Sequence, residues 1–112
     1  VYRATDPKLG RAVALKVLHA GRFTDAADRG RFRTEAEAVA RLSHPHIVQV
    51  YEVGEHQGVP YFSLDFCAGG SLERRLRGTP LPPRHAAALV EQLAEAVEHA
   101  HAQGIIHRDL KP

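Results

Sequence analysis

Residues 47–66 read IVQVYEVGEHQGVPYFSLDF, and they decide the architecture of the chain. Two runs rich in β-branched and aromatic residues, 47–54 and 59–66, flank the short polar segment 55–58, which ends in glycine. This arrangement is typical of a β-hairpin, so we expect two neighbouring antiparallel strands. Gly69 and Gly70 follow the second run and predict that a different part of the structure begins there.

Two further strands are predicted on the N-terminal side of the hairpin. Residues 1–5 read as the end of one strand, residues 6–10 as a Pro- and Gly-containing turn, and residues 11–18 as the next strand. In the second strand the side chains alternate, so Ala14 and Lys16 share one face and Leu15 points to the other.

A helix is predicted between these strands and the hairpin. After the polar loop 19–24, Thr24 or Asp25 can cap a helix that runs to about Leu42. Its apolar positions recur at helical spacing and form one stripe: Phe32, Ala36, Val39 and Ala40. The proline of the segment 43–46 ends it.

Two helices are predicted on the C-terminal side. Residues 71–77 form a short capped helix, and a Pro-rich connector leads to a long helix over about 83–103. Its buried stripe consists of Leu89, Leu93, Val97 and Ala100, and Gly104 is its expected C-cap. Strands, a helix, strands and then helices indicate an α+β fold, with a small sheet-plus-helix lobe joined to the start of a helical lobe.

Composition limits the class of protein. The 112 residues suffice for one small domain, and the formal charge of +2 is carried by interspersed residues, so no nucleic-acid partner is indicated. Cys67 is the single cysteine, which fits a reducing compartment. No apolar run approaches the roughly 18 residues of a membrane span. The chain opens on what reads as mid-strand, without Met, so we expect a fragment that is cut at both ends.

Lys16 is the first residue that suggests chemistry. It lies mid-strand between apolar residues, where its amine needs a partner, and the next helix offers Glu35 and Glu37. These glutamates are two residues apart and face differently, so only one can serve well. An ammonium held by a carboxylate can grip a phosphate, but the residues by themselves favour a simpler interpretation, an exposed edge-strand lysine with both glutamates solvated.

The segment 107–112, His-Arg-Asp-Leu-Lys-Pro, is the second such feature. Asp109 lies between two cations and can accept a proton, while Lys111 can neutralise a nearby anion. This combination suits transfer of a charged group to a hydroxyl.

In this order the motifs resemble a eukaryotic-type protein kinase of the Ser/Thr class widespread in bacteria, from just after the glycine-rich loop to the catalytic loop. The resemblance covers the whole chain and rests on Val13-Ala14-Leu15-Lys16, Phe32-Arg33-Thr34-Glu35, residues 43–48, residues 64–72 and residues 107–112. It implies the two-lobe kinase fold in truncated form. An antiparallel N-lobe sheet with helix C would occupy residues 1–66, the hinge residues 67–70 and the first C-lobe helices residues 71–112.

The resemblance also implies roles for individual residues. The ATP-binding residues would be Lys16 and Glu35 at the phosphates, Val1 and Ala14 over the adenine ring, Leu64 as gatekeeper, the backbone of Asp65 and Cys67 at the adenine edge, and Ser71 near the ribose. Asp109 would be the catalytic base and Lys111 would stabilise the transferring phosphoryl group, at a position that points to Ser/Thr substrates. Arg108 would pair with a phosphorylated activation loop.

The implied cofactors are ATP and Mg²⁺, with the metal ligands beyond Pro112, and the implied partner is a protein substrate. No metal site is predicted within the chain, because the histidine pairs at 44 and 46 and at 99 and 101 have spacings that place no two ligands on one helix face. We expect a cytoplasmic location, with any membrane anchor elsewhere in the parent chain. We also expect the 112 residues alone to be inactive, since the glycine-rich loop and the Asp-Phe-Gly metal site of the family lie outside them.

Two other functions remain open at this point. The parent could be a pseudokinase that serves as a nucleotide-binding or docking module; an Asn and an Asp-Phe-Gly motif after Pro112 would favour an enzyme instead. It could also phosphorylate a small molecule, as aminoglycoside kinases do, although Leu110-Lys111-Pro112 and the hinge resemble protein kinases better.

Overall fold

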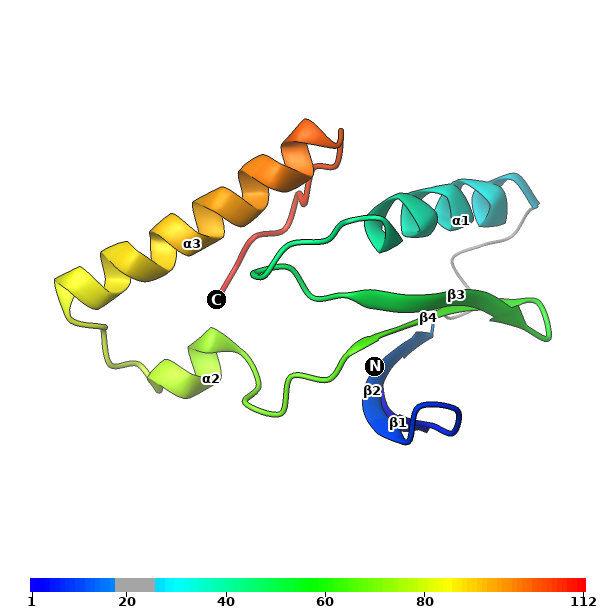
Figure 1. Ribbon diagram of the computed structural model, residues 1–112, viewed down its shortest axis with the longest axis horizontal. Coiled ribbons are helices and arrows are strands. Elements are labelled where there is room, and N and C mark those ends of the chain that lie inside the picture. Colours follow the sequence, from blue (N-terminus) through cyan, green and yellow to red (C-terminus); the bar gives the residue numbers. More distant parts are fainter. Residues whose placement is uncertain (18–25) are drawn as a thin grey trace. The chain divides into compact units, whose positions relative to one another are not determined.

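The computed structural model describes residues 1–17 and 26–112, apart from the side chain at position 28 (Figure 1). Leu18, the loop 19–24 and the proposed caps Thr24 and Asp25 lie outside the described residues. The elements in chain order are β1 (Tyr2–Asp6), β2 (Arg11–Val17), α1 (Ala26–Ala40), β3 (Val50–His56), β4 (Val59–Asp65), α2 (Leu72–Leu76) and α3 (Pro83–Ala102). They form two compact units, the first of residues 1–43 and 48–66 and the second of residues 44–47 and 67–112.

The first unit contains a four-stranded antiparallel sheet in the order β1-β2-β4-β3. The predicted hairpin is confirmed: β3 pairs with β4 around a turn in which Gln57 and Gly58 both have positive φ, 50° and 77°. Positive φ at both central residues is the geometry that matches the twist of the flanking strands, and it favours glycine. The turn between β1 and β2 is held by the Asp6 carboxylate, which accepts from the N–H of Lys8 at 2.8 Å.

The start of β3 differs from the prediction. Ile47 and Val48 have strand-like side chains, but the Ile47 N–H donates to the His44 carbonyl at 3.1 Å, so this stretch forms a turn. The strand begins at Val50 and continues to His56, two residues beyond the predicted end, and its register shifts between Val50 and Glu52. Local backbone hydrogen bonding outweighs β-propensity here.

One glycine of β3 allows a close side-chain approach. A Cβ at Gly54 would lie 2.7 Å from both Cζ and Oη of Tyr61, its partner on β4. The Tyr61 ring passes over Gly54, and its hydroxyl donates to Oε1 of Glu52 at 3.0 Å. Glycine is therefore required for the observed position of the ring.

Helix α1 packs on the sheet against β3 and β4. The ring of Phe32 stacks on that of Phe62 with centroids 6.2 Å apart, and Ala36 of the same helix is buried. The predicted stripe therefore faces the sheet, although Val39 is 36% exposed at its edge. Regular helix ends at Ala40 rather than Leu42, because the Leu42 N–H bonds to the carbonyl three residues back instead of four.

The second unit contains α2, α3 and the C-terminal segment. Ser71 caps α2, and its Oγ accepts from the Arg74 N–H at 3.2 Å. Helix α3 ends as predicted at a left-handed glycine: Gly104 has φ of 75°, its N–H donates to the His101 carbonyl, and the Ile105 N–H donates to the Ala100 carbonyl. This pair of bonds is a Schellman motif, which turns the chain into residues 105–112.

The predicted apolar stripe of α3 is unevenly buried. Leu89 and Val97 are half-buried, whereas Leu93 is 45% exposed and the neighbouring Val90 62%. The buried residue of the helix is Ala96, which lies outside the predicted stripe and is 6% exposed. Within the described parts of the chain, no helix combines the length and the apolar character that a membrane crossing requires.

Candidate functional site

The first unit presents Lys16 on the sheet face that α1 partly covers. In antiparallel strands, directly opposite residues share a face, and the register places Ala14 opposite Leu64 and Lys16 opposite Phe62. Val50 of β3 also lies opposite Leu64, and Val53 opposite Phe62, so apolar side chains from three strands surround the lysine position. The strand pairing thus brings the predicted pocket residues Ala14, Lys16 and Leu64 onto one face.

The Lys16 ammonium lies 5.6 Å from the centroid of the Phe62 ring. Lys16 is exposed, and it lies directly opposite Phe62 of β4. At an exposed position such a cation–π contact contributes about 0.5–1 kcal/mol. Phe62 therefore holds the ammonium over the sheet face without neutralising its charge.

Glu35 approaches the same phenylalanine from α1. It is exposed and lines an apolar cavity of about 170 Å³ together with Phe32, Ala36, Val39, Val50 and Phe62. Lys16 and Glu35 both belong to the described part of the chain, and no ion pair joins them. An exposed pair contributes at most about 1 kcal/mol, so the two side chains gain little from meeting in the absence of a ligand.

Glu37, the other glutamate that the sequence offered, is engaged on its own helix. Its Oε1 accepts from Arg33 Nε at 2.9 Å, one turn away. Of the two glutamates, only Glu35 is directed to the cavity that Phe62 lines.

Asp65 ends β4, and both of its carboxylate oxygens are engaged. Oδ1 accepts from the Tyr51 hydroxyl and Oδ2 from the Gln49 N–H, the latter at 3.1 Å. The hydroxyl bond, together with the backbone bond, lowers the pKa of Asp65 below its ordinary value of 3.8, and it raises the pKa of Tyr51 above 10.0. Sequence reasoning assigned a role to the Asp65 backbone and missed this side-chain arrangement, because the pairing joins positions 14 and 16 residues apart.

The remaining residues that the resemblance assigns to ATP binding, Val1, Cys67 and Ser71, are exposed. Val1 is 82% exposed and precedes β1, and Cys67 is an exposed free thiol just after the first unit. The Ser71 hydroxyl accepts the capping bond of α2 described above.

The second unit brings the predicted base and its lysine together. Lys111 Nζ lies 2.9 Å from Oδ2 of Asp109, with both side chains more than 70% exposed. The Asp109 N–H donates to Nδ1 of His107 at 3.2 Å, and the histidine is exposed. The Glu73 N–H of α2 donates to the Pro112 carbonyl at 3.2 Å and holds the end of the loop.

Arg108 adopts a left-handed backbone conformation, with φ of 64°. The other two non-glycine residues with positive φ in the described chain, Gln57 and Arg77, occupy a hairpin turn and a helix C-cap. Such a conformation costs a side-chain-bearing residue about 1–2 kcal/mol, and strain of this kind is frequent at functional loops.

Three histidine rings of the second unit come together. His44 lies 5.6 Å from His46 and 5.2 Å from His99 between ring centroids, a proximity that local spacing did not predict. Even so, over residues 1–17 and 26–112 no three His, Cys, Asp or Glu side chains form a group that could hold a metal ion.

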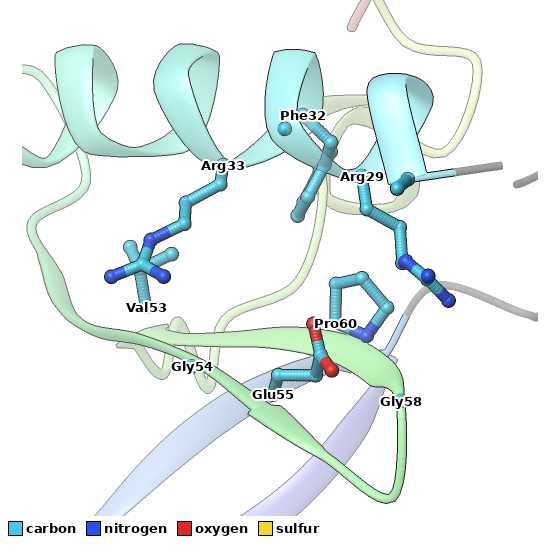
Figure 2. Close-up of a pocket in the computed structure, with 10 residues that line it drawn as sticks. Arg29, Phe32, Arg33, Val53, Gly54, Glu55, Gly58 and Pro60 are labelled. Atoms are coloured by element: carbon cyan, nitrogen blue, oxygen red, sulfur yellow. The ribbon is translucent and has the colours of Figure 1, made fainter.

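Figure 2 shows a second cavity of the first unit, with a volume of about 700 Å³. It is bounded by the first half of α1 and the β3–β4 hairpin, and Figure 2 shows Phe32 and Arg33 descending from the helix toward Val53 and Pro60. Neither Lys16 nor Glu35 lines it.

The motifs thus lie on defined elements: Val13–Lys16 on β2, Glu35 on α1 and His107–Pro112 after α3. The sequence model of the protein kinase domain matches residues 1–112, the whole length. The chain belongs to the protein kinase domain family. The likeness extends to individual bacterial kinases. The chain is 41% identical to the serine/threonine-protein kinase PknJ of Mycobacterium tuberculosis over 112 residues and 38% identical to PrkC of Bacillus subtilis over 113 residues.

The fold agrees with this membership. A crystal structure of the Mycobacterium tuberculosis PknI kinase domain superposes with a TM-score of 0.83 at 34% identity, over 99% of this chain and 46% of that one. The α+β kinase fold with an antiparallel sheet is therefore confirmed. The whole of this chain is matched, but it spans only 19% of the length of PknJ and 17% of the length of PrkC.

Proposed function

We propose that the protein carrying these residues transfers the terminal phosphoryl group of ATP to Ser or Thr side chains of proteins. One observation carries the proposal: within His-Arg-Asp-Leu-Lys-Pro, Lys111 Nζ is held 2.9 Å from the Asp109 carboxylate. This places a proton acceptor and a cation side by side, and phosphoryl transfer depends mainly on positioning and charge neutralisation. Asp109 would receive the hydroxyl proton of the substrate, and Lys111 would neutralise charge on the phosphoryl oxygens.

The first unit supports nucleotide binding. Ala14 and Leu64 form a flat apolar row across β2 and β4, which suits a planar ring, and Lys16 extends from the next row of the same face. Lys16 would bind phosphate oxygens, and Glu35 would orient its ammonium once a ligand draws the two together. Val1, Asp65, Cys67 and Ser71 would complete the nucleotide contacts, as the resemblance to the family suggests. The proposed lobe division is residues 1–66, 67–70 and 71–112.

Magnesium is implied by the family, but residues 1–17 and 26–112 do not form a site for it. Asp109 already binds Lys111, and the described residues offer no group of three possible ligands. We expect the metal ligands beyond Pro112, as the resemblance to the family implies. Because ATP is the phosphoryl donor, we expect a cytoplasmic location for this domain.

The test uses the full-length protein, ATP labelled at the terminal phosphate, a panel of protein substrates and phosphoamino-acid analysis. We expect labelled Ser or Thr, and a loss of labelling of about 100-fold or more in both Asp109→Asn and Lys16→Met. Lys8→Met, which changes a lysine in the β1–β2 turn, is the matched control and should retain activity.

Other results would support the alternatives. ATP binding without transfer to any substrate would identify a pseudokinase, and phosphorylation confined to small molecules would identify a small-molecule kinase. Labelling unchanged in Asp109→Asn would contradict the proposed base.

A further inference from the structure

Asp65 is the last residue of β4, and its side chain meets Tyr51 of β3 and Gln49, the residue that precedes β3. We call Gln49, Tyr51 and Asp65 the Asp65 clamp. Within it the Asp65 carboxylate accepts from the Tyr51 hydroxyl and the Gln49 N–H, while the Asp65 N–H donates to the Gln49 carbonyl at 3.0 Å. A carboxylate that accepts two bonds, beside a backbone N–H that donates a third, leaves this residue little rotational freedom.

Gln49 connects the clamp to α1. Its side-chain Nε2 donates to the Ala40 carbonyl at 3.4 Å and to the Val50 carbonyl at 3.0 Å. Ala40 is the last residue of α1, the helix that carries Glu35. Gln49 therefore connects the Asp65 backbone to the end of this helix through hydrogen bonds.

Tyr51 connects the clamp to β2. The guanidinium carbon of Arg11 lies 3.8 Å from the centroid of the Tyr51 ring, so the ring is held between that cation and the Asp65 carboxylate. Arg11 begins the strand that carries Ala14 and Lys16. All of these contacts lie within the first unit.

We propose that the Asp65 clamp positions the backbone carbonyl of Asp65 to recognise the adenine edge of the nucleotide, with Tyr51 as a positioning residue. The inference rests on the proposed function, which places that carbonyl at the adenine. What it adds is a role for the clamp: by restraining Asp65 it would keep the carbonyl in place to accept a hydrogen bond from the amino group of adenine, whereas guanine presents a carbonyl there and would be repelled. The clamp therefore favours ATP over GTP.

The chain supplies a matched control for Tyr51. Tyr61 lies on the same sheet, its hydroxyl donates to a carboxylate, that of Glu52, and its pKa is raised for the same reason. It differs in place, because it lies opposite Val17 and Gly54, four positions before Asp65 on β4. If the tyrosine–carboxylate bonds serve stability alone, removing either hydroxyl should have the same effect.

The experiment compares Tyr51→Phe, Tyr61→Phe and wild type in the full-length protein, with ATP and GTP as probes. Equilibrium dissociation constants are measured by titration calorimetry, kcat and KM by phosphate transfer, and Tm by thermal unfolding. We expect Tyr51→Phe to raise the Kd and KM for ATP about fivefold to tenfold, the range in which one hydrogen bond to a charged group is partly lost. The kcat should stay within about twofold, the Kd for GTP should change little, and Tyr61→Phe should resemble wild type in all nucleotide constants.

A second substitution tests the inference independently if Tyr51→Phe fails to fold. Asp65→Asn keeps the shape of the side chain and removes its charge. It should raise the Kd for ATP about threefold to fivefold and reduce the preference for ATP over GTP. Equal nucleotide constants for Tyr51→Phe and Tyr61→Phe, in a protein whose wild type binds ATP, would overturn the inference. A wild type that binds no ATP would instead overturn the proposed function, so the two failures are distinguishable.

Discussion

Phe62 joins the fold to the candidate site, so its replacement tests the structural reasoning most directly. Its ring stacks on Phe32 of α1 at 6.2 Å, carries the Lys16 ammonium at 5.6 Å and lines the cavity beside Glu35. The substitution Phe62→Leu keeps an apolar side chain and removes the ring. We expect α1 to be held less firmly on the sheet and Glu35 to be less well placed.

The magnitude follows from the contacts. An aromatic pair contributes about 0.5–1.5 kcal/mol beyond its buried area, and this is the contribution that links α1 to β4. The Lys16 contact is worth about 0.5–1 kcal/mol but joins β2 to β4, so its loss should not loosen the helix. A change of about 1 kcal/mol in the local opening of α1 corresponds to roughly a fivefold change in its opening constant.

Amide hydrogen exchange of the full-length protein, read by mass spectrometry, measures this opening. Exchange over Ala26–Ala40 should become about fivefold faster in Phe62→Leu. In a protein that already carries Phe32→Leu, the same change should have a much smaller effect, because the pair is already broken. The control is Tyr2→Leu, an aromatic replacement on β1 at a residue 57% exposed, which should leave exchange of α1 unaltered. The reasoning is refuted if Phe62→Leu accelerates amide exchange of α1 equally in the wild-type and the Phe32→Leu backgrounds.

Four further predictions follow from individual contacts. Lys16→Met should abolish phosphate transfer by the full-length protein, about 100-fold or more, while leaving its Tm within a few degrees; unaltered transfer would show that another cation serves. Gly54→Ala should lower the free energy of unfolding by about 1–3 kcal/mol, because the new Cβ would meet Tyr61 at 2.7 Å, and the cost should vanish in a Tyr61→Ala background; an equal cost in both would exclude this clash. The Tyr51–Asp65 bond should stabilise the fold between two pH limits. Because the pKa of Asp65 is lowered, its stabilisation is present above about pH 3.8 and is lost as the pH falls through the lowered pKa. Because the pKa of Tyr51 is raised, its stabilisation is present below pH 10.0 and is lost as the pH rises through the raised pKa. The stability difference between wild type and Tyr51→Phe in urea should therefore be largest near pH 7 and shrink at both extremes, and a difference independent of pH would contradict the bond. Finally, residues 1–112 expressed alone should transfer no phosphate above background, and Mg²⁺-dependent labelling of a substrate by this segment would disprove that expectation.

Much of the fold could be predicted because its signals are local. The hairpin turn at Gly58, the cap at Ser71 and the helix stop at Gly104 each require a particular backbone conformation, and the residue type at each position supplies it. Alternation in β2 placed Ala14 and Lys16 on one face before any partner strand was known. The order of the kinase motifs predicted the family, which the match over the whole chain confirms.

The start of β3 could not be predicted in this way. Ile47 and Val48 have the side chains of a strand, yet the backbone bond between Ile47 and His44 makes a turn there. Residues 44–47 group with the second unit, and the ring of His44 lies 5.2 Å from that of His99, far along the chain. Local propensity carries no information about such contacts.

The sequence by itself predicted, through the order of its kinase motifs, which residues would do the chemistry: Lys16, Glu35, Asp109 and Lys111. Only the tertiary structure decided what surrounds them. Sheet order β1-β2-β4-β3 places β2 beside β4, so Lys16 lies over Phe62 instead of against a carboxylate, and it brings Tyr51 to Asp65. The physical reason is that strand pairing and helix packing join positions distant along the chain, and their geometry depends on all the elements at once.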